Sequence, residues 1–303
     1  MSSQARGRGA DLSRVMSECA ESIPIRPEEP VRLSQKLWRL TCANPGVMTG
    51  PGTNTYLLGE EERWTIIDPG PGGERHLRAM LAAAPGRIER ILVTHTHPDH
   101  SPGALALQSV TGAELIGRTS TRTRGQDASF QPARQPDDGD RLRLGKDLTL
   151  RVIHTPGHAS NHLCYLLEEE RLLFTGDHVI QGSTVLIDPP DGDMGAYLAS
   201  LERLLGEDLR CLAPGHGTLM PQPREAVRAL IRHRLRRESK VLAVLRDSTP
   251  SDLACLVARV YDDVPAERHA LAERSLLAHL LKLEAEGLAG ETAGRWSAGA
   301  GPC

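Results

Sequence analysis

Aromatic side chains are scarce in this sequence: phenylalanine, tryptophan and tyrosine together make up 3 % of its 303 residues. The core therefore has to be built mainly from leucine, valine, isoleucine and alanine. Paired cysteines are lacking as well, because the six cysteines are scattered and none belongs to a Cys-x-x-Cys motif. This pattern argues against a disulfide framework and against a cysteine zinc site, and it predicts reduced thiols in a cytoplasmic protein.

Long apolar runs and an excess of charge are also missing. No run approaches the ~18–20 apolar residues that a membrane-spanning helix needs. The first thirty residues carry arginines and glutamates but no apolar stretch of signal-peptide length. We therefore expect no membrane partner. The net charge of −3 gives no general attraction to nucleic acid or anionic lipid, so any such affinity would need a local patch.

The chain divides into four parts by composition and periodicity. Residues 1–30 resemble a flexible or loosely attached lead-in. Residues 31–222 alternate short β-rich runs with helical segments, which is typical of an α/β domain. Residues 223–245 follow a single helical period and are expected to form a linker helix. Residues 246–303 contain two helical segments and a glycine-bounded end, which suggests a small helix-turn-helix module.

The densest group of polar side chains follows a buried strand expected within residues 87–95. The sequence THTHPDH places His95, His97, Asp99 and His100 within six positions. Imidazoles and carboxylates are costly to bury side by side unless they share a partner, and a metal ion is the obvious one. His95 and His97 occupy alternate positions, so both can point to the same side of an extended segment.

Three further strands are expected to end in a glycine followed by a ligand-type residue, in TPGH, TGD and PGH. Ligands gather at strand ends because the sheet holds them rigidly. The resulting five histidines and two carboxylates are too many for one tetrahedral zinc and suit two ions. We assign His95, His97 and His158 to a first ion, Asp99, His100 and His216 to a second, and Asp177 to a bridge between them.

An open position between two such ions distinguishes a catalytic site from a structural one. We therefore predict hydrolysis by a metal-bridging hydroxide, with Asp99 and Asp177 as its catalytic residues: Asp99 orients the hydroxide and Asp177 holds the ions. The imidazole-rich donor set favours two Zn²⁺ ions, with iron or manganese as alternatives. Among the remaining histidines, we expect His154 to be structural, and His162 and His178 to lie behind the ligands.

The motifs THTHPDH, TPGH, TGDH and APGHG, in this order, resemble those of the metallo-β-lactamase superfamily. The resemblance covers almost all of the chain beyond residue 30 and supports the ligand assignment. It implies an α/β fold, an αββα sandwich with a dinuclear site at one edge. It also implies that Asp68, in IIDPG, orients a histidine or a loop beside the metals, although a plain turn role is the alternative. Pro102 stands where the family has glycine while Gly103 is kept, so we expect a stiffer loop and an intact site.

The segments around this motif set resemble the lactamase-β-2-like subgroup, in which a winged-helix domain follows. At least the animal member of that subgroup is an endoribonuclease that cleaves single strands. The resemblance implies a winged helix over residues 246–303 and single-stranded RNA as a candidate substrate. A small-molecule ester, thioester, lactone or β-lactam is the alternative substrate. A non-enzymatic scaffold is a third interpretation, which the complete ligand set argues against.

An RNA substrate would require a way to hold phosphates. One helix face carries arginines at four-residue spacing, but we favour a solvated face partly paired with Glu225 and Glu238. Aromatic stacking platforms are few, and we expect the candidates to serve packing. We expect the winged helix to serve packing or dimerisation, which leaves a homo-oligomer open. The arginines are Arg224, Arg228, Arg232 and Arg236, extended by Arg237, Lys240 and nearby Arg234, and the aromatic candidates are Trp38, Tyr56, Phe130 and Tyr197.

Overall fold

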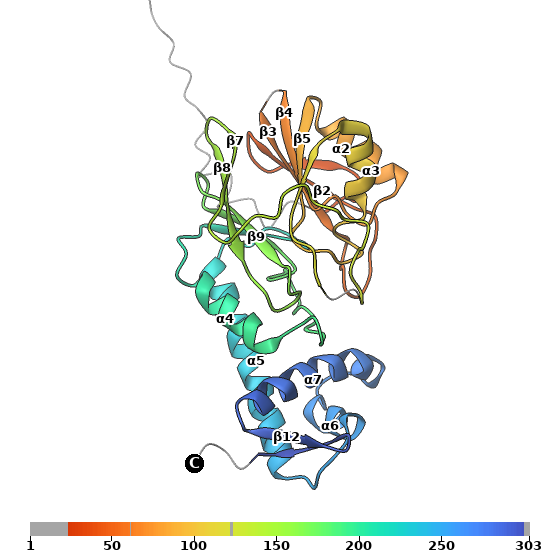
Figure 1. Ribbon diagram of the computed structural model, residues 1–303, viewed down its shortest axis with the longest axis vertical. Helices are drawn as coiled ribbons and strands as arrows, with labels where there is room; N and C mark the ends of the chain where they lie inside the picture. Colours follow the sequence, from red (N-terminus) through yellow and green to blue (C-terminus); the bar gives the residue numbers. More distant parts are fainter. Residues whose placement is uncertain (1–23, 61, 122–123, 300–303) are drawn as a thin grey trace, which may run out of the picture.

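The computed structural model describes residues 24–60, 62–121 and 124–299 of the chain. Two β-sheets face each other in the larger part of the molecule, and helices cover the outer side of each sheet (Figure 1). A smaller helical part with a short hairpin follows at the other end of the molecule. This arrangement confirms the expected αββα sandwich with a carboxyl-terminal winged helix.

The first sheet has the strand order β1-β2-β3-β4-β5-β6. Its side chains alternate between two cores, as the period of two along a strand requires. Leu57 and Ile66 face helices α2 and α3, whereas Tyr56 and Ile67 face the second sheet. The elements are β1 (Pro30–Arg32), β2 (Leu37–Thr41), β3 (Asn54–Glu60), β4 (Arg63–Ile67), α2 (Glu74–Ala83), β5 (Arg87–Leu92), α3 (Gly103–Thr111) and β6 (Glu114–Ile116).

The second sheet has the order β11-β10-β9-β8-β7, and β11 runs parallel to β10 while the other pairs are antiparallel. Its outer face packs against helices α4 and α5 through a second apolar cluster that includes Leu173, Tyr197 and Leu230. The hairpin expected around residues 168–171 is present. The elements are β7 (Arg141–Gly145), β8 (Leu148–His154), β9 (Leu163–Leu167), β10 (Leu172–Gly176), α4 (Met194–Leu204), β11 (Cys211–Pro214) and α5 (Pro223–Arg246).

Helix α5 belongs to two cores at once. Near its start, Val227 packs with the outer face of the second sheet. Near its end, Val241 and Leu245 pack with the winged helix. The ends of α5 lie close to the predicted domain boundaries, but the division into domains stays a prediction because this helix serves both parts. The winged helix is built from α6 (Leu253–Val260), η1 (Ala266–Arg268), α7 (His269–Ala285), β12 (Ala289–Thr292) and β13 (Arg295–Ala298).

Residues 1–23 of the predicted lead-in lie outside the described residues. The rest of it contacts the first sheet: the Glu28 amide donates to the Thr41 carbonyl at 2.8 Å, and the Glu28 carboxylate meets His76. The described cysteines Cys42, Cys164, Cys211 and Cys255 are all free thiols. In the part of the chain that the structure describes, no helix combines the length and the apolar character needed to cross a membrane.

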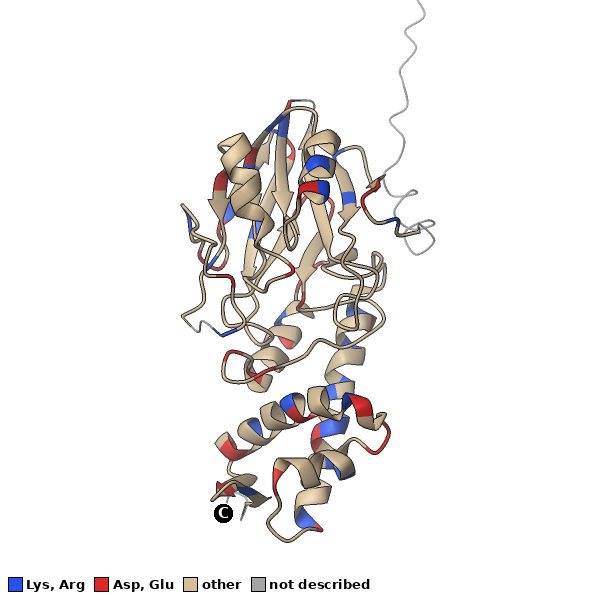
Figure 2. Cartoon of the chain, turned by 90° about the vertical axis from the view of Figure 1, so that its right-hand side faces the viewer, with Lys and Arg blue, Asp and Glu red and all other residues tan. Residues whose placement is uncertain are grey.

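The basic face predicted on α5 is only partly available to solvent. Arg224, Arg228, Arg232 and Arg236 are exposed, but Arg234 is buried and donates to the Val185 carbonyl. Glu238 was expected to pair with the arginines of its own helix. It faces His279 and Lys282 of α7 instead. Figure 2 shows acidic and basic residues interspersed along α5 and the winged helix. Arg237 and Lys240 pair with Asp263 and Asp262.

Candidate metal centre

All seven predicted ligands come together at one edge of the sandwich. His95 follows β5, His158 follows β8, Asp177 follows β10 and His216 follows β11. The donor atoms form two groups, and within each group they lie less than 4.8 Å from one another. The first group is His95, His97 and His158, and the second is Asp99, His100, Asp177 and His216.

The first group consists of three imidazoles whose ring nitrogens converge. His97 Nδ1 lies 3.0 Å from His95 Nε2 and 2.9 Å from His158 Nε2. Burial and the neighbouring imidazoles lower the pKa of His95 well below its ordinary value, and burial followed by His158 lowers the pKa of His97 to about 3. Both rings are therefore neutral near pH 7, so their nitrogens present the lone pairs that a divalent ion binds.

The second group places carboxylates against imidazoles. His216 Nε2 lies 3.1 Å from Asp177 Oδ1 and 3.3 Å from Asp99 Oδ2. The other carboxylate oxygen, Asp177 Oδ2, lies 3.6 Å from His158 Nε2 in the first group. Asp177 therefore faces both groups, and its position is that of a bridging ligand.

The electrostatics of the second group favour a cation. Burial alone would lower the pKa of His216, but Asp177 and Asp99 raise it to about 10. Burial alone would raise the pKa of Asp177, but His216 and His100 hold it well below its ordinary value. His100 Nε2, His216 Nε2 and Asp177 Oδ1 are buried and have no hydrogen-bond partner among the described residues. Buried polar atoms without a hydrogen-bond partner are costly, and a divalent ion would satisfy all three.

Three ligand-type histidines are oriented from behind through their other nitrogen. His100 Nδ1 lies 2.9 Å from Asp68 Oδ2, His158 Nδ1 lies 2.7 Å from the Leu186 carbonyl, and His216 Nδ1 lies 3.2 Å from the Gly52 carbonyl. Each contact leaves Nε2 directed into the centre. Asp68 thus sits where it was expected, behind a histidine of the site.

Asp68 is itself held firmly in a backbone conformation that aspartate seldom adopts, with φ of 52°. The Thr94 hydroxyl donates to Asp68 Oδ2 at 2.7 Å, and the Thr55 hydroxyl donates to the Asp68 carbonyl at 2.6 Å. Thr55 Oγ1 also lies 2.9 Å from His76 Nε2, whose Nδ1 lies 2.8 Å from Glu28 Oε2. A chain of buried contacts therefore runs from Glu28 to the residue behind His100, and no local sequence motif predicts it.

The remaining histidines stay outside both groups. His162 Nδ1 lies 2.9 Å from Thr155 Oγ1, and its ring centroid lies 5.0 Å from that of His95. His178 is buried against Tyr197, and burial lowers the pKa of His178 to about 3. His154 Nε2 contacts the Ser160 carbonyl at 3.1 Å. None of the three belongs to the two donor groups, and the expected place of His162 and His178 behind the ligands stays a prediction.

Two glycines of the motifs are required by close packing. A Cβ at Gly215, the residue before His216, would lie 2.8 Å from Asp177 Oδ1. A Cβ at Gly103 would lie 2.3 Å from the Pro69 carbonyl oxygen. Pro102 is tolerated because it directly precedes helix α3, where its fixed φ suits the start of a helix. The departure from the expected glycine therefore leaves the ligand loop intact.

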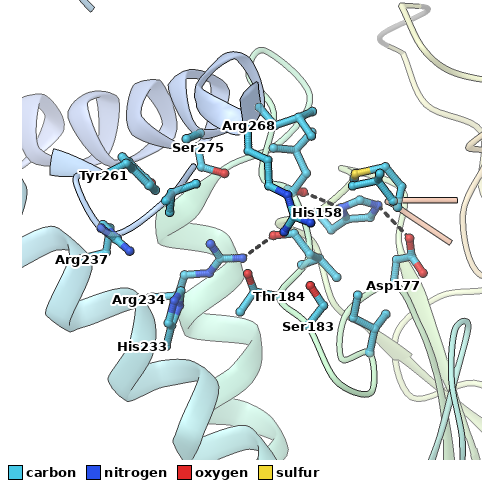
Figure 3. A pocket seen from close by; sticks show the side chains of 18 residues that line it. His158, Asp177, Ser183, Thr184, His233, Arg234, Arg237, Tyr261, Arg268 and Ser275 are labelled. Atoms are coloured by element: carbon cyan, nitrogen blue, oxygen red, sulfur yellow. Dashed lines mark hydrogen bonds and ion pairs between the residues drawn. The ribbon is translucent and has the colours of Figure 1, made fainter. Parts of the chain in front are cut away.

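A cavity of about 240 Å³ opens beside the two groups, between the sandwich and the winged helix. Figure 3 shows His158 and Asp177 on one side of it and Arg268 and Ser275 of the winged helix on the other. Sequence reasoning did not single out Arg268 or Ser275 as site residues, because nothing in the linear pattern brings them to His158. Much of the remaining wall is apolar, formed by residues such as Ile180, Leu186, Val264 and Leu271.

Comparison with known families decides the relationship. The model of the metallo-beta-lactamase superfamily matches residues 48–216, which is more than half of the chain. The chain belongs to this superfamily. The model of the beta-lactamase associated winged helix domain matches residues 253–296. The chain is thus a metallo-beta-lactamase superfamily hydrolase whose His/Asp cluster fits a dinuclear metal site.

Several curated proteins are similar in sequence to this chain over most of its length. An atrochrysone carboxyl ACP thioesterase from Aspergillus fumigatus is 36 % identical, over 75 % of this chain and 70 % of its own. A beta-lactamase-like protein 2 homolog from Caenorhabditis elegans is 32 % identical, over 78 % of this chain and 80 % of its own. The homolog of the same name from Drosophila melanogaster is 31 % identical, over 84 % of this chain and 90 % of its own.

Solved structures show the same fold. A beta-lactamase domain protein from Burkholderia ambifaria superimposes with a TM-score of 0.78 at 20 % identity, over 96 % of this chain and 99 % of that one. TTHA1623, whose structure is described as a di-iron-bound form, has a TM-score of 0.51 at 28 % identity, over 62 % of this chain and 96 % of its own. A related sandwich is thus described with two iron ions bound.

Proposed function

We propose that this protein is a dinuclear metal-dependent hydrolase of esters or thioesters. The observation that carries the proposal is the position of Asp177, which faces both donor groups and also lines the cavity. A substrate in the cavity would lie next to the ions with its apolar part against residues such as Ile180 and Val264. Two of the similar proteins are named as ACP thioesterases, which supports this class of substrate.

The ligand assignment follows from the two groups. His95, His97 and His158 would hold one ion, Asp99, His100 and His216 the other, and Asp177 both. Two divalent ions supply Lewis acidity and make water a better nucleophile near neutral pH. We favour Zn²⁺ because imidazole nitrogen is its common ligand, and iron is the principal alternative, given the di-iron form of TTHA1623.

The chain itself contributes proton transfer and orientation. The Asp99 side chain is 26 % exposed, which makes it the more accessible carboxylate of the second group. The Thr53 hydroxyl donates to Asp99 Oδ2 at 3.3 Å and holds this oxygen toward His216. We assign Asp99 to orient the attacking water and to accept its proton. The apolar wall excludes bulk water from the bound acyl group.

Single-stranded RNA is the second candidate substrate. It is favoured by the exposed arginines along α5 and by Arg268 in the cavity. It is disfavoured because Tyr56, Phe130 and Tyr197 are buried and offer no stacking surface. Arg237, moreover, is paired with Asp263 and is not free for phosphate. We therefore place esters and thioesters first.

The test combines metal content with hydrolysis. The wild type, Asp177→Ala and the control Asp247→Ala, which changes an exposed carboxylate of the α5–α6 loop, are reconstituted with zinc and analysed by mass spectrometry. They are then assayed with acyl thioesters, esters, lactones, a β-lactam and a labelled single-stranded RNA. We expect two equivalents of metal, thioester or ester cleavage at least 100-fold lower in Asp177→Ala, and no change in the control. Cleavage of RNA alone would replace the proposed substrate class, and less than one equivalent of zinc in the wild type would refute the metal centre.

A further inference from the structure

The wall of the cavity opposite the metal centre is supplied by the winged helix. Arg268 at the end of η1 and Ser275 in α7 line this wall, while His158 and Asp177 line the side of the sandwich. Figure 3 shows the Arg268 side chain extending from the winged helix toward His158. A substrate that reaches the ions therefore also reaches side chains of the second domain.

The charged side chains on the winged-helix side of the cavity are all basic. Asp177, on the metal side, is the one acidic residue among those that line the cavity, whereas three arginines line it. Two of these arginines are engaged: Arg237 with Asp263 at 2.7 Å, and Arg234 with the Val185 carbonyl. Arg268 is exposed, and no side-chain hydrogen bond or ion pair is recorded for it within the described residues. Its positive charge is thus available to a ligand.

A second group points to the same ligand. Ser275 is only 7 % exposed and lines the cavity, and Figure 3 shows its side chain on the wall that Arg268 also supplies. The buried Arg234 keeps an unpartnered Nε at this wall. A buried guanidinium nitrogen without a partner costs free energy, so this nitrogen and the Ser275 hydroxyl suit a ligand with acceptor oxygens.

We propose that this wall is an anion subsite, in which Arg268 and Ser275 bind a carboxylate or phosphate group of the substrate remote from the bond that is cleaved. The inference rests on the proposed function and narrows its substrate class. The preferred substrate is an ester or thioester with a second, negatively charged end, and the winged helix is the domain that selects it. Charge-assisted hydrogen bonds from Arg268 and a donated hydrogen bond from Ser275 hold the charged end while the carbonyl faces Asp177.

The kinetic test compares two thioesters of equal length, a glutaryl monothioester with a free carboxylate and a neutral pentanoyl thioester. We expect the wild type to prefer the glutaryl substrate in kcat/KM. Arg268→Gln should lower the ratio of glutaryl to pentanoyl kcat/KM about tenfold, and Ser275→Ala should lower it less. The control is Arg259→Gln, which changes an exposed arginine of the same domain that pairs with Asp247 and does not line the cavity. An unchanged ratio in Arg268→Gln would overturn the proposal.

A binding measurement separates failure of the subsite from failure of the proposed function. Glutaramate (the monoamide of glutarate), neutral pentanamide and propyl phosphate are titrated calorimetrically into the metal-loaded protein and into Arg268→Gln. Tighter binding of glutaramate or propyl phosphate than of pentanamide, lost in Arg268→Gln, supports the subsite even if no thioester is hydrolysed. The order of the two anions assigns carboxylate or phosphate. Equal binding of all three by the wild type refutes the subsite even if thioesters are cleaved.

Discussion

At the scale of single residues, the hydrogen bond made by one ring nitrogen of a histidine orients the other nitrogen. His100, His158 and His216 each direct Nδ1 to an oxygen acceptor behind the site, which leaves Nε2 for the centre. His162 Nδ1 likewise lies 2.9 Å from Thr155 Oγ1, but its unpartnered Nε2 lies beside Gly176 and outside both donor groups. The acceptors behind the site therefore orient three of the five ligand-type histidines, while the position of the ring excludes His162.

The contact between Asp68 and His100 yields the first prediction. Asp68→Asn keeps the shape of the side chain but removes the charge behind His100, so the imidazole becomes a weaker ligand. We expect the affinity for the second metal equivalent to fall about 10- to 100-fold while the first is less affected. Competition with a zinc-binding dye measures both equivalents. Asp137→Asn, at a carboxylate that is 86 % exposed, is the control, and equal weakening of both equivalents would contradict the assignment of His100 to one ion.

The residues of the site were predictable where they follow a short motif. The seven ligand-type residues lie in four segments that each end a strand, and a strand end is a recognisable signal. The support behind them was not predictable, because Glu28, Thr55 and His76 contact one another across 21 to 48 positions of sequence. Arg268 and Ser275 were missed for the same reason, since only the packing of two domains brings them to the cavity.

At the scale of elements, helix α7 organises the winged helix through one face. Leu276 is fully buried in the core of this domain, whereas Leu281 on the same helix is 40 % exposed. Leu276→Ala should lower the free energy of unfolding by about 2–5 kcal/mol, because the cavity it leaves cannot fully collapse. Leu281→Ala should change it by about 0.5 kcal/mol or less. Urea denaturation followed by circular dichroism measures both, and similar losses for the two variants would contradict the packing.

The junction of α5 and α7 predicts a pH dependence of stability. Glu238 of α5 contacts His279 and Lys282 of α7. Burial lowers the pKa of His279 below 6.5. Burial alone would raise the pKa of Glu238, but His279 and Lys282 lower it below 4.5. Both groups bind protons more weakly when folded, so acidification favours the unfolded chain: the contribution of His279 is lost as the pH falls below 6.5, and that of Glu238 as it falls below 4.5.

Urea unfolding of the wild type and of His279→Gln at pH 8, 6 and 5 checks this dependence. The wild type should lose stability between pH 8 and pH 5, and His279→Gln should lose less over the same interval because the titrating imidazole is absent. Glu286→Gln, which changes a largely exposed partner of Lys282, is the control and should follow the wild type. Parallel pH profiles for all three proteins would show that His279 does not carry the effect.

Most elements could be predicted from local pattern, and the exceptions have physical reasons. The sequence pattern predicts α2, α4 and the β9–β10 hairpin well, because in each of them the apolar periodicity ends at a proline, a glycine or a charged turn. Strand β7 was not predicted, because its alternation of arginine and leucine in RLRLG is short and adjoins a polar loop. The role of α5 in two cores was also missed, since periodicity shows that a face is apolar but not which domain covers it.

At the scale of the whole molecule, our two proposals divide catalysis and substrate selection between the sandwich and the winged helix. Strand ends of the sandwich present the donor groups, and residues of the winged helix line the cavity beside them. The ion pair between Arg274 of α7 and Asp188 of the sandwich also joins the two parts. Because α5 contributes to both cores, we expect the two parts to unfold together.

This shared helix makes metal removal a test of the whole molecule. Without ions, the second donor group keeps buried polar atoms without a hydrogen-bond partner, and ions that bind only the folded chain add to its stability. Metal at 100 times its dissociation constant adds about 2.7 kcal/mol for each ion bound, which corresponds to a rise in Tm of roughly 4 °C per ion for a chain of about 300 residues. Differential scanning calorimetry should show one transition that moves down on dialysis against a chelator and recovers on addition of zinc. In Asp177→Ala the shift should be much smaller, because the residue that faces both groups is gone. A second transition whose midpoint temperature does not depend on metal would mean that the winged helix unfolds independently, and that α5 does not couple the two cores.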